Sequence, residues 1–509
     1  MNDPFETELK FQVPLPSLAA VKRSLATQTA RTLALQARYF DTPDQRLATH
    51  GVALRMRREG MQWVQTVKAL GPSAVLRLEH EVRLDPSEDE PPLDPARHAG
   101  TAAGAALAAA LGDGAAPLQL VFETRVLRTL RVVRHAGALV EVALDIGEVI
   151  AGERRHPLCE LEFELKRGSF DGLVGLAGRW AQRHGLWLDV RSKAERGLRL
   201  ARAAEAGLPA QSDQCALTPE MTGDGALRAM VRACLAQILP AAAAVAEADE
   251  EAERLHQLRV GLRRLRCALR MFGDVSAATD PNWGTALATL FNRLGSTRDR
   301  DVFALTVFPA LRAAGAPLAE LPPDARSEDP GEAVRGFACT ELLLNLLAFA
   351  HGAMPPPRAN DGAETPPMLT LWQPRLRLLR RQLHTEAEQF MDLDDEARHR
   401  CRRRLKRWRY SLEFAAPLYA KRAMRRNLTR VRAAQEIFGR YNDLATAEQA
   451  FRALTSQDPR AWFAVAWLKA QREQLVPGAR KALVKVVTAA RELRPPKSHT
   501  DRRPSDAGR

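Results

Sequence analysis

The chain has 509 residues, which is too long for a single hydrophobic core, so two to four domains are expected. Apolar residues make up 46% and charged residues 27% of the sequence, proportions that argue against disorder as the default state. The net charge of +14 falls mainly on the C-terminal part, because residues 1–205 carry 28 Lys and Arg against 26 Asp and Glu, whereas residues 206–509 carry 47 against 35.

The first 200 residues contain short runs in which apolar and polar residues alternate, bounded by Gly, Pro and Asp, a pattern typical of antiparallel strands. The expected strands are 6–13, 52–58, 62–68, 76–84, 139–144 and 158–166. Helices are expected at Leu18–Leu25 and 170–185, with a small Ala-rich helix following a Pro-rich loop in 85–116. Eight or so strands in this length predict a closed barrel.

Charged side chains occupy one face of several of these strands. Glu6, Glu8 and Lys10 share a face in β geometry, while Leu9 and Phe11 share the other. The same alternation recurs at Arg55/Arg57, Thr66/Lys68, Arg77/Glu79/Glu81 and Glu160/Glu162/Glu164. A strand face exposed to solvent explains one such run equally well. Exposure does not explain why some strands carry mainly acidic residues on this face and others mainly basic ones. The pattern therefore predicts a charged lumen, in which carboxylates hold Mg²⁺ or Mn²⁺ and basic residues hold an oxygen-rich anion.

These residues carry a family resemblance. The segment resembles the CYTH domain of the triphosphate tunnel metalloenzymes across nearly all of residues 1–202. The matching motifs are Glu6-x-Glu8-x-Lys10, Tyr39-Phe-Asp41-Thr42, Leu54-Arg55-x-Arg57, Lys68, Arg125, Asp145, Glu160-x-Glu162 and Ser192-Lys193-x-Glu195-Arg196-Gly197. The resemblance implies an eight-stranded antiparallel tunnel. That family includes inorganic, thiamine and RNA triphosphatases and class IV adenylate cyclases.

The resemblance also implies roles for individual residues. The metal would be held by Glu6, Glu8, Asp145, Glu160 and Glu162, and the triphosphate by Lys10, Arg55, Arg57, Lys68, Arg125 and Lys193. Of these, Glu6, Glu8, Lys10, Arg55 and Arg57 would be catalytic. Glu79 and Glu81 would be either further tunnel acids or braces for neighbouring basic side chains. The implied reaction is in-line attack of water on a terminal phosphoryl group, without a covalent intermediate.

From about residue 218 the pattern changes to apolar residues three and four apart, which predicts an all-α region. Helices are expected at 226–239, 254–272, 283–294 and 397–418, with loops at 321–331 and 354–367. The expected organisation is a tunnel domain at 1–205, a linker at 206–217, a helical domain at 218–495 and a disordered tail at 496–509. The fold class is thus α+β and multidomain.

The helical region contains an internal repeat. His256-x-x-Arg259-x-x-x-Arg263-Arg264-x-Arg266 recurs as His399-x-x-Arg402-x-x-x-Lys406-Arg407-x-Arg409, and Gly295-Ser-Thr-Arg-Asp299 recurs as Gly439-Arg-Tyr-Asn-Asp443. Two copies in one order predict a duplicated helical bundle. In each copy, helical spacing places basic residues along one face of the helix and apolar residues along the opposite face. The second copy has Glu413 where the first has Arg270, so its cationic stripe is shorter. Few acids pair with these cations at helical spacing, so an anionic partner is expected.

The repeats resemble the CHAD domain, a helical module associated with inorganic polyphosphate, over residues 218–495. The resemblance implies polyphosphate binding by His256, Arg259, Arg263, Arg264, Arg266, His399, Arg402, Lys406, Arg407 and Arg409. Nucleic acid is a less favoured partner, because few aromatic residues interleave the arginines for base stacking. The two histidines lack neighbours at metal-ligand spacing.

The expected function is metal-dependent hydrolysis of inorganic triphosphate to pyrophosphate and phosphate, with the helical domain binding polyphosphate. Two alternatives remain open at this point. One is a tunnel enzyme acting on thiamine triphosphate, a nucleoside triphosphate or ATP cyclisation, and the other is a non-catalytic polyphosphate-binding protein. Scattered cysteines and the lack of a leading apolar segment lead us to expect reduced thiols, no membrane partner and a cytoplasmic location, with association with polyphosphate granules as an option.

Overall fold

The computed structural model describes residues 5–85, 91–112, 117–202, 215–247, 252–295, 303–322, 329–352 and 367–493. Most of the expected linker, the expected tail at 496–509, and Arg298 and Asp299 of the first repeat lie outside these residues. The chain divides into two compact units. The first comprises Met1–Gln211, Leu235–Glu250 and Gly331–Met354, and the second Ser212–Cys234, Glu251–Pro330 and Pro355–Arg509. The short stretches 235–250 and 331–354 therefore belong to the same unit as the N-terminal strands.

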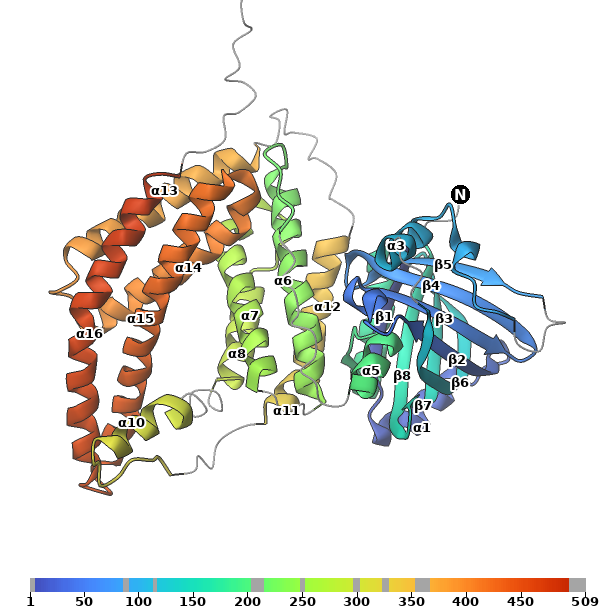
Figure 1. Ribbon diagram of the computed structural model, residues 1–509, viewed down its shortest axis with the longest axis horizontal. Helices are drawn as coiled ribbons and strands as arrows, with labels where there is room; N and C mark the ends of the chain where they lie inside the picture. The colour runs from blue at the N-terminus through green and yellow to red at the C-terminus, as the bar shows by residue number, and fades with distance from the viewer. Residues whose placement is uncertain are drawn as a thin grey trace, which may run out of the picture. The chain divides into compact units, whose positions relative to one another are not determined.

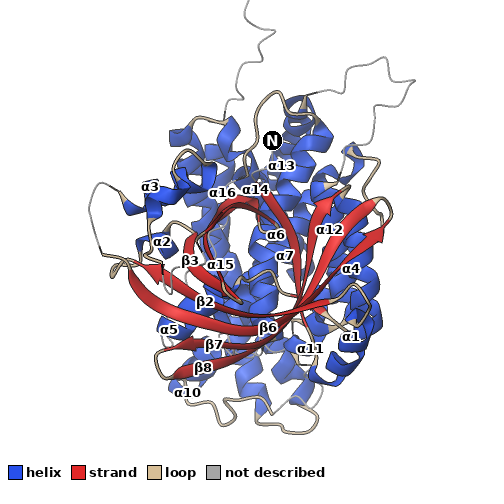
Figure 2. Ribbon diagram, turned by 90° about the vertical axis from the view of Figure 1, so that its right-hand side faces the viewer, coloured by secondary structure: helices blue, strands red, loops and turns tan. Residues whose placement is uncertain are grey.

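The first unit is built on an antiparallel barrel of eight strands, as predicted. The strands are β1 (Phe5–Gln12), β2 (Arg31–Asp41), β3 (Val52–Glu59), β4 (Gln62–Ser73), β5 (Leu76–Arg83), β6 (Gln119–His135), β7 (Ala138–Ala151) and β8 (Arg154–Arg167). They are ordered β5-β4-β3-β2-β6-β7-β8-β1, and pairing of β5 with β1 closes the ring. A short ninth strand, β9 (Trp187–Leu188), extends the sheet beside β1. Figure 2 shows the strands curving around a common centre.

Side-chain alternation divides each strand between the lumen and an outer apolar layer. In β1, Leu9 and Phe11 are fully buried in the outer layer, and Phe11 makes an edge contact with Phe163 of β8. Charged residues occupy the alternate positions. This arrangement confirms the inverted pattern predicted from the sequence, with charges inside and apolar residues outside.

Helices cover parts of the outer surface of the barrel. The helices of the N-terminal region are α1 (Leu18–Leu25), α2 (Arg46–Thr49), α3 (Ala102–Leu111), α4 (Phe170–His184) and α5 (Lys193–Arg202). The Ala-rich helix α3 packs Leu107 against Val52 and Val67 of the sheet. Helix α5 lies so close to β6 that a Cβ atom on Gly197 would come within 2.2 Å of the Phe122 ring. Glycine at that position lets α5 approach the barrel.

The remaining regular structure is helical (Figure 1), as predicted. The helices are α6 (Gly223–Ala246), α7 (Ala252–Phe272), α8 (Trp283–Arg293), α10 (Phe308–Ala313), α11 (Pro330–Arg335), α12 (Phe337–His351), α13 (Met368–Glu388), α14 (Asp395–Ala415), α15 (Lys421–Leu454) and α16 (Ala461–Ala490). Helix α6 has the length and apolar composition of a membrane span, but 83% of its most apolar window is buried inside the protein. A buried core helix has the same composition.

The two repeat helices, α7 and α14, pack against each other in the second unit. Their apolar stripes form part of its core, with Leu262 and Leu265 of α7 and Leu405 and Leu412 of α14 completely buried. The cationic stripes, on the other faces of the same helices, are left to line a cavity. The six cysteines are free thiols, five of them buried.

Candidate functional site

A cavity of about 480 Å³ fills the barrel and receives side chains from all eight of its strands and from α5. Its lining carries ten basic and nine acidic residues, so it is dense in charge and nearly neutral overall. They are Lys10, Arg31, Arg55, Arg57, Lys68, Arg77, Arg83, Arg128, Lys166 and Lys193, with Glu6, Glu8, Glu59, Glu79, Glu81, Glu141, Asp145, Glu162 and Glu164. We call this cavity the tunnel.

Strand register brings the acids of one wall together. Asp145 of β7 lies opposite Glu160 of β8 and opposite Arg128 of β6, and Glu162 of β8 lies opposite Lys10 of β1. Directly opposed side chains in antiparallel strands are close neighbours. As a result, Asp145, Glu160 and Glu162 each offer a carboxylate oxygen within 4.8 Å of the others. We call these three residues the acid cluster.

Helix α5 places Lys193 at the acid cluster. Ser192 and Glu195 form a reciprocal cap at the start of the helix: the Glu195 carboxylate accepts from the Ser192 amide at 2.6 Å, and the Ser192 hydroxyl accepts from the Glu195 amide at 3.2 Å. Lys193 Nζ lies 2.7 Å from Asp145 Oδ2 and 2.9 Å from Glu162 Oε1, and it also pairs with Glu160. Burial alone would lower the pKa of Lys193, but the three carboxylates raise it well above the usual value.

The acid cluster suits a hard divalent cation. Glu160 is fully buried, and burial raises the pKa of its carboxyl group. Its Oε2 atom has no hydrogen-bond partner among the described residues. Three convergent carboxylates with a buried, unsatisfied oxygen are the donor set that Mg²⁺ and Mn²⁺ prefer. Lys193 supplies the positive charge between them.

Glu6 and Glu8, the other two predicted metal ligands, line the tunnel but lie outside the acid cluster. Glu6 pairs with Lys68, and Glu8 pairs with Lys10. Burial would raise the pKa of Glu6, but the nearby Lys68 and Lys10 lower it to about 2. The pKa of Glu6 is thus held low and Glu8 is paired with Lys10, and the role of both residues as metal ligands stays a prediction.

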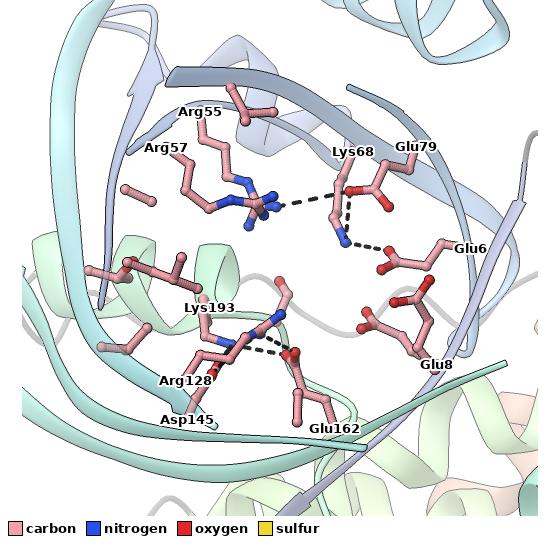
Figure 3. Close-up of a pocket in the computed structure, with 18 of the residues that line it drawn as sticks. Glu6, Glu8, Arg55, Arg57, Lys68, Glu79, Arg128, Asp145, Glu162 and Lys193 are labelled. Atoms are coloured by element: carbon pink, nitrogen blue, oxygen red, sulfur yellow. Dashed lines mark hydrogen bonds and ion pairs between the residues drawn. The ribbon is translucent and has the colours of Figure 1, made fainter. Parts of the chain in front are cut away.

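The opposite part of the tunnel is rich in basic groups. Arg55 and Arg57 extend from β3 and Lys68 from β4, and Figure 3 shows their charged ends directed into the same space as Lys193 and Arg128. Arg57 lies 3.1 Å from Glu81, and Lys68 lies 3.2 Å from Glu79.

The pKa values of two groups beside these cations are shifted from their ordinary values. Arg55 donates to the Tyr39 hydroxyl at 3.3 Å, and although burial would raise the pKa of Tyr39, Arg55 and two lysines lower it. Glu79 behaves in the opposite way, because burial raises its pKa to about 7 against the pull of Lys68. Glu79 and Glu81 thus both line the tunnel and contact its basic residues, so the structure combines the two roles left open for them.

The structure does not bring Arg125 to the tunnel. Its side chain is 55% exposed and pairs with Glu123 at 3.3 Å, because odd-numbered residues of this part of β6 point away from the lumen. Arg128 takes its place inside, where two of its nitrogens donate to Asp145 at 2.7 and 2.6 Å. Sequence reasoning missed Arg128. Arg128 lies an even number of residues from the lumen residues Thr124 and Val126, but that these face the lumen follows from strand pairing and not from the sequence pattern.

A second cavity, of about 920 Å³, lies between the repeat helices of the second unit, and we call it the helical cleft. Its charged lining consists of ten basic residues, two histidines and one acid. They are His256, Arg259, Arg263, Arg266, Arg270, His399, Arg400, Arg402, Arg403, Arg404, Lys406, Arg407 and Asp443. The guanidinium groups of Arg259, Arg263 and Arg266 lie 4.6 to 5.8 Å from the centre of the Phe291 ring, a cation–π arrangement.

Two family models match the chain in succession. The model of the CYTH domain matches residues 4–198, and that of the CHAD domain matches residues 229–452. The chain is a CYTH domain followed by a CHAD domain.

The chain is 32% identical over 160 residues to an inorganic triphosphatase from Haemophilus influenzae, a match that covers 31% of this chain and 44% of that protein. It thus spans less than half the length of this curated relative. The crystal structure of the CHAD domain from the plant Ricinus communis is 28% identical, with a TM-score of 0.46, and covers 57% of this chain and 99% of that one. A putative adenylyl cyclase from Hippeastrum, described as having a dominant triphosphatase activity, is 17% identical, with a TM-score of 0.26, and covers 37% and 91%.

Eight of the ten residues predicted to bind polyphosphate line the helical cleft, which we call the CHAD cleft from here on because its lining residues all fall within the CHAD match. Arg264 does not, because it is 6% exposed and its guanidinium lies 5.4 Å from the centre of the Phe414 ring. Arg409 does not either, because it donates to Glu413 at 2.7 Å and to Gln435 at 3.0 Å. Those acceptors hold Arg409 away from the cleft. The second repeat has Glu413 where the first has Arg270, and Glu413 also binds Arg409, so the cationic stripe of α14 loses two positive charges from the cleft rather than one.

Other basic residues take part in the CHAD cleft without having been predicted. Arg400, Arg403 and Arg404 are brought in by the crossing of α7 and α14, and Arg270, already expected on the cationic stripe, joins them. His399 Nδ1 donates to Asn442 Oδ1 at 3.1 Å, so the downstream motif of the second repeat meets its helix in the cleft. The corresponding motif of the first repeat falls partly outside the described residues.

Proposed function

We propose that the CYTH tunnel hydrolyses inorganic triphosphate to pyrophosphate and phosphate with Mg²⁺ or Mn²⁺, and that the CHAD cleft binds inorganic polyphosphate. The observation that carries the first part is the placing of ten basic side chains around one small cavity, with Asp145 and Glu162 of the acid cluster in its wall and Glu160 beside them. The match over 160 residues to an inorganic triphosphatase supports the same substrate class. Carboxylates among so many cations serve no purpose in simple anion capture.

Each part of the tunnel has a chemical task in this proposal. A divalent cation held by the acid cluster would neutralise charge on phosphoryl oxygens and act as a Lewis acid. Arg55 and Arg57 offer paired donors to phosphate oxygens, and Lys68 offers a compact positive charge. Fixed cations around the transferred group stabilise the charge that develops there, so positioning and electrostatics supply the catalysis.

The charge of the tunnel must be rearranged when substrate binds. Lys193 and Arg128 pair with the acid cluster in the free protein. A cation taking the carboxylates would release both side chains to bind phosphate. Metal and triphosphate binding should therefore favour each other. The metal takes the carboxylates away from Lys193 and Arg128, and the triphosphate then gives these two cations new partners.

A phosphate-release screen tests the tunnel. Tripolyphosphate, ATP, thiamine triphosphate and pyrophosphate are each supplied with Mg²⁺ or Mn²⁺ to the wild type and to Glu162→Gln. We expect release from tripolyphosphate above the other substrates, and a loss of at least about 100-fold in the variant. Equal release by both proteins would refute the site, and faster release from an organic triphosphate would refute the substrate.

The proposal for the CHAD cleft rests on its excess of cations, ten against one acid among the described lining residues. A flexible phosphate chain can contact several arginines at once, and its binding should be strongly weakened by salt. Polyphosphate binding is measured by fluorescence anisotropy in the wild type and in Arg263→Glu/Arg266→Glu. Undiminished affinity in that variant would contradict the assignment.

A further inference from the structure

Lys406 lies among positive charges in the CHAD cleft. It is half-buried on α14, one turn after Arg402 and Arg403, and it faces Arg259 and Arg263 of α7. The titratable and charged groups that surround it come from all three helices that form this part of the cleft. They are His256, Arg259, Arg263 and Arg266 of α7, His399, Arg402, Arg403 and Arg407 of α14, and Asp443 of α15.

The surroundings of Lys406 are opposite to those of the tunnel lysines. Lys193 contacts three carboxylates and Lys68 two, and in both cases these acids raise the lysine pKa. Among the described residues, Lys406 makes no ion pair. Burial lowers its pKa most, and Arg402 and Arg263 lower it further, to about 6, against the pull of Asp443. At neutral pH the free cleft therefore holds this amine largely uncharged.

A bound phosphate chain reverses that balance. Its oxygens bring negative charge next to the Lys406 amine and offset the repulsion from the arginines, so the protonated form becomes the favoured one. We propose that the CHAD cleft binds its phosphate chain together with a proton, which Lys406 takes up as the anion enters. This inference rests on the proposed function, because it requires the cleft to be a polyphosphate site.

Linkage fixes the direction of the effect. The unliganded amine loses its proton above about pH 6, whereas a lysine stabilised by an anion keeps it toward the ordinary value of 10.5. Between these limits the bound state holds more protons than the free state, so affinity falls as the pH rises, by up to about tenfold per pH unit. Arginine at this position stays charged throughout, and its binding should lack this component.

Isothermal titration calorimetry measures the proton directly. Polyphosphate is titrated at about pH 8 into the full chain carrying Arg55→Ala/Arg128→Ala, with EDTA present so that the tunnel does not contribute. Repeating the titration in buffers of different ionisation enthalpy gives the number of protons taken up. We expect an uptake larger by about one proton with Lys406 than with Lys406→Arg. The ligand itself contributes equally to both proteins and cancels, and carrying His399→Gln in both removes the histidine whose pKa Lys406 helps to lower.

The pH profile provides the second readout. The affinity of the protein that keeps Lys406 should fall as the pH rises above about 6. The Lys406→Arg variant should bind more tightly at about pH 8, and its affinity should vary less with pH. Equal proton uptake by the two proteins, with binding intact in both, would overturn this inference and leave the polyphosphate site standing. Absence of polyphosphate binding in both proteins would overturn the inference and the site together.

Discussion

The tunnel and the CHAD cleft each present ten Lys and Arg residues, but only the tunnel matches them with acids, nine against one among the described lining residues. In the tunnel, Lys68, Arg57 and Lys193 all contact carboxylates at hydrogen-bonding range. In the cleft, cations stack on an aromatic ring or face one another. Because the basic residues of the tunnel already contact carboxylates, an anion can bind them only when another group binds those carboxylates. A divalent metal does this. The cleft has one acid among its described lining residues, so an anion can enter it without a metal.

The largest expected effect separates two arginines of one strand. Arg128→Ala should lower triphosphate hydrolysis by about 100-fold to 1,000-fold, because it removes a fixed cation inside the tunnel. Arg125→Ala, three residues away on the outer side, should stay within about twofold of the wild type. Steady-state phosphate release measures both. A reversal of the two effects would mean that the register of β6 places the wrong residue inside.

Stability provides the next contrast. Lys193→Met should lower the free energy of unfolding in EDTA by about 3–5 kcal/mol, because three buried carboxylates lose their cation. Mg²⁺ should restore part of the loss. Arg263→Met in the CHAD cleft should instead stabilise by about 0.5 kcal/mol or more, since it relieves repulsion between like charges. Chemical denaturation measures both, and destabilisation of similar size in the two variants would remove the contrast.

Metal should act on the two sites in opposite directions. Raising Mg²⁺ should switch on hydrolysis in the tunnel and weaken polyphosphate binding in the CHAD cleft by about threefold to tenfold, because the metal neutralises the phosphate chain before it meets the arginines. Binding is followed by anisotropy in Arg128→Ala, so that the ligand is not consumed. Ca²⁺ serves as a control for charge alone. Tighter binding with Mg²⁺ would show that the cleft also uses metal.

The smallest expected effect lies within the CHAD cleft. Arg266→Ala should weaken polyphosphate binding by about threefold to tenfold, because it removes a cation that faces the cavity. Arg409→Ala should change the affinity by less than about twofold, since its guanidinium is held by Glu413 and Gln435. A titration of each variant at one salt concentration decides this. Equal losses would mean that Arg409 leaves those partners to join the ligand.

Much of the tunnel could be predicted from the sequence, because in β1 and β8 charge alternates strictly with apolar residues and the two faces are unambiguous. In strand β6 the same reasoning gave a wrong prediction, because it assigned Arg125 to the tunnel. Arg125 and Arg128 both stand among apolar residues, and only pairing with β2 and β7 decides which one points inward. The acid cluster likewise depends on the register between β7 and β8, which single-strand patterns do not contain.

The CHAD cleft shows the corresponding limit for helices. Helical spacing correctly grouped His399, Arg402 and Lys406 on one side of α14. It also grouped Arg409 with them, although Gln435 of α15 draws that side chain elsewhere. A helical wheel gives the direction of a side chain from its own helix, whereas long side chains are finally placed by acceptors on neighbouring helices.

The location of bound metal tests the contrast between the two sites most directly. Crystals soaked with Mn²⁺ and a slowly hydrolysed triphosphate analogue would be measured for anomalous scattering. We expect a Mn²⁺ peak beside Asp145, Glu160 and Glu162 and none in the CHAD cleft. Mn²⁺ bound among the arginines of the cleft, or a tunnel that binds the analogue with no metal at the acid cluster, would contradict this expectation.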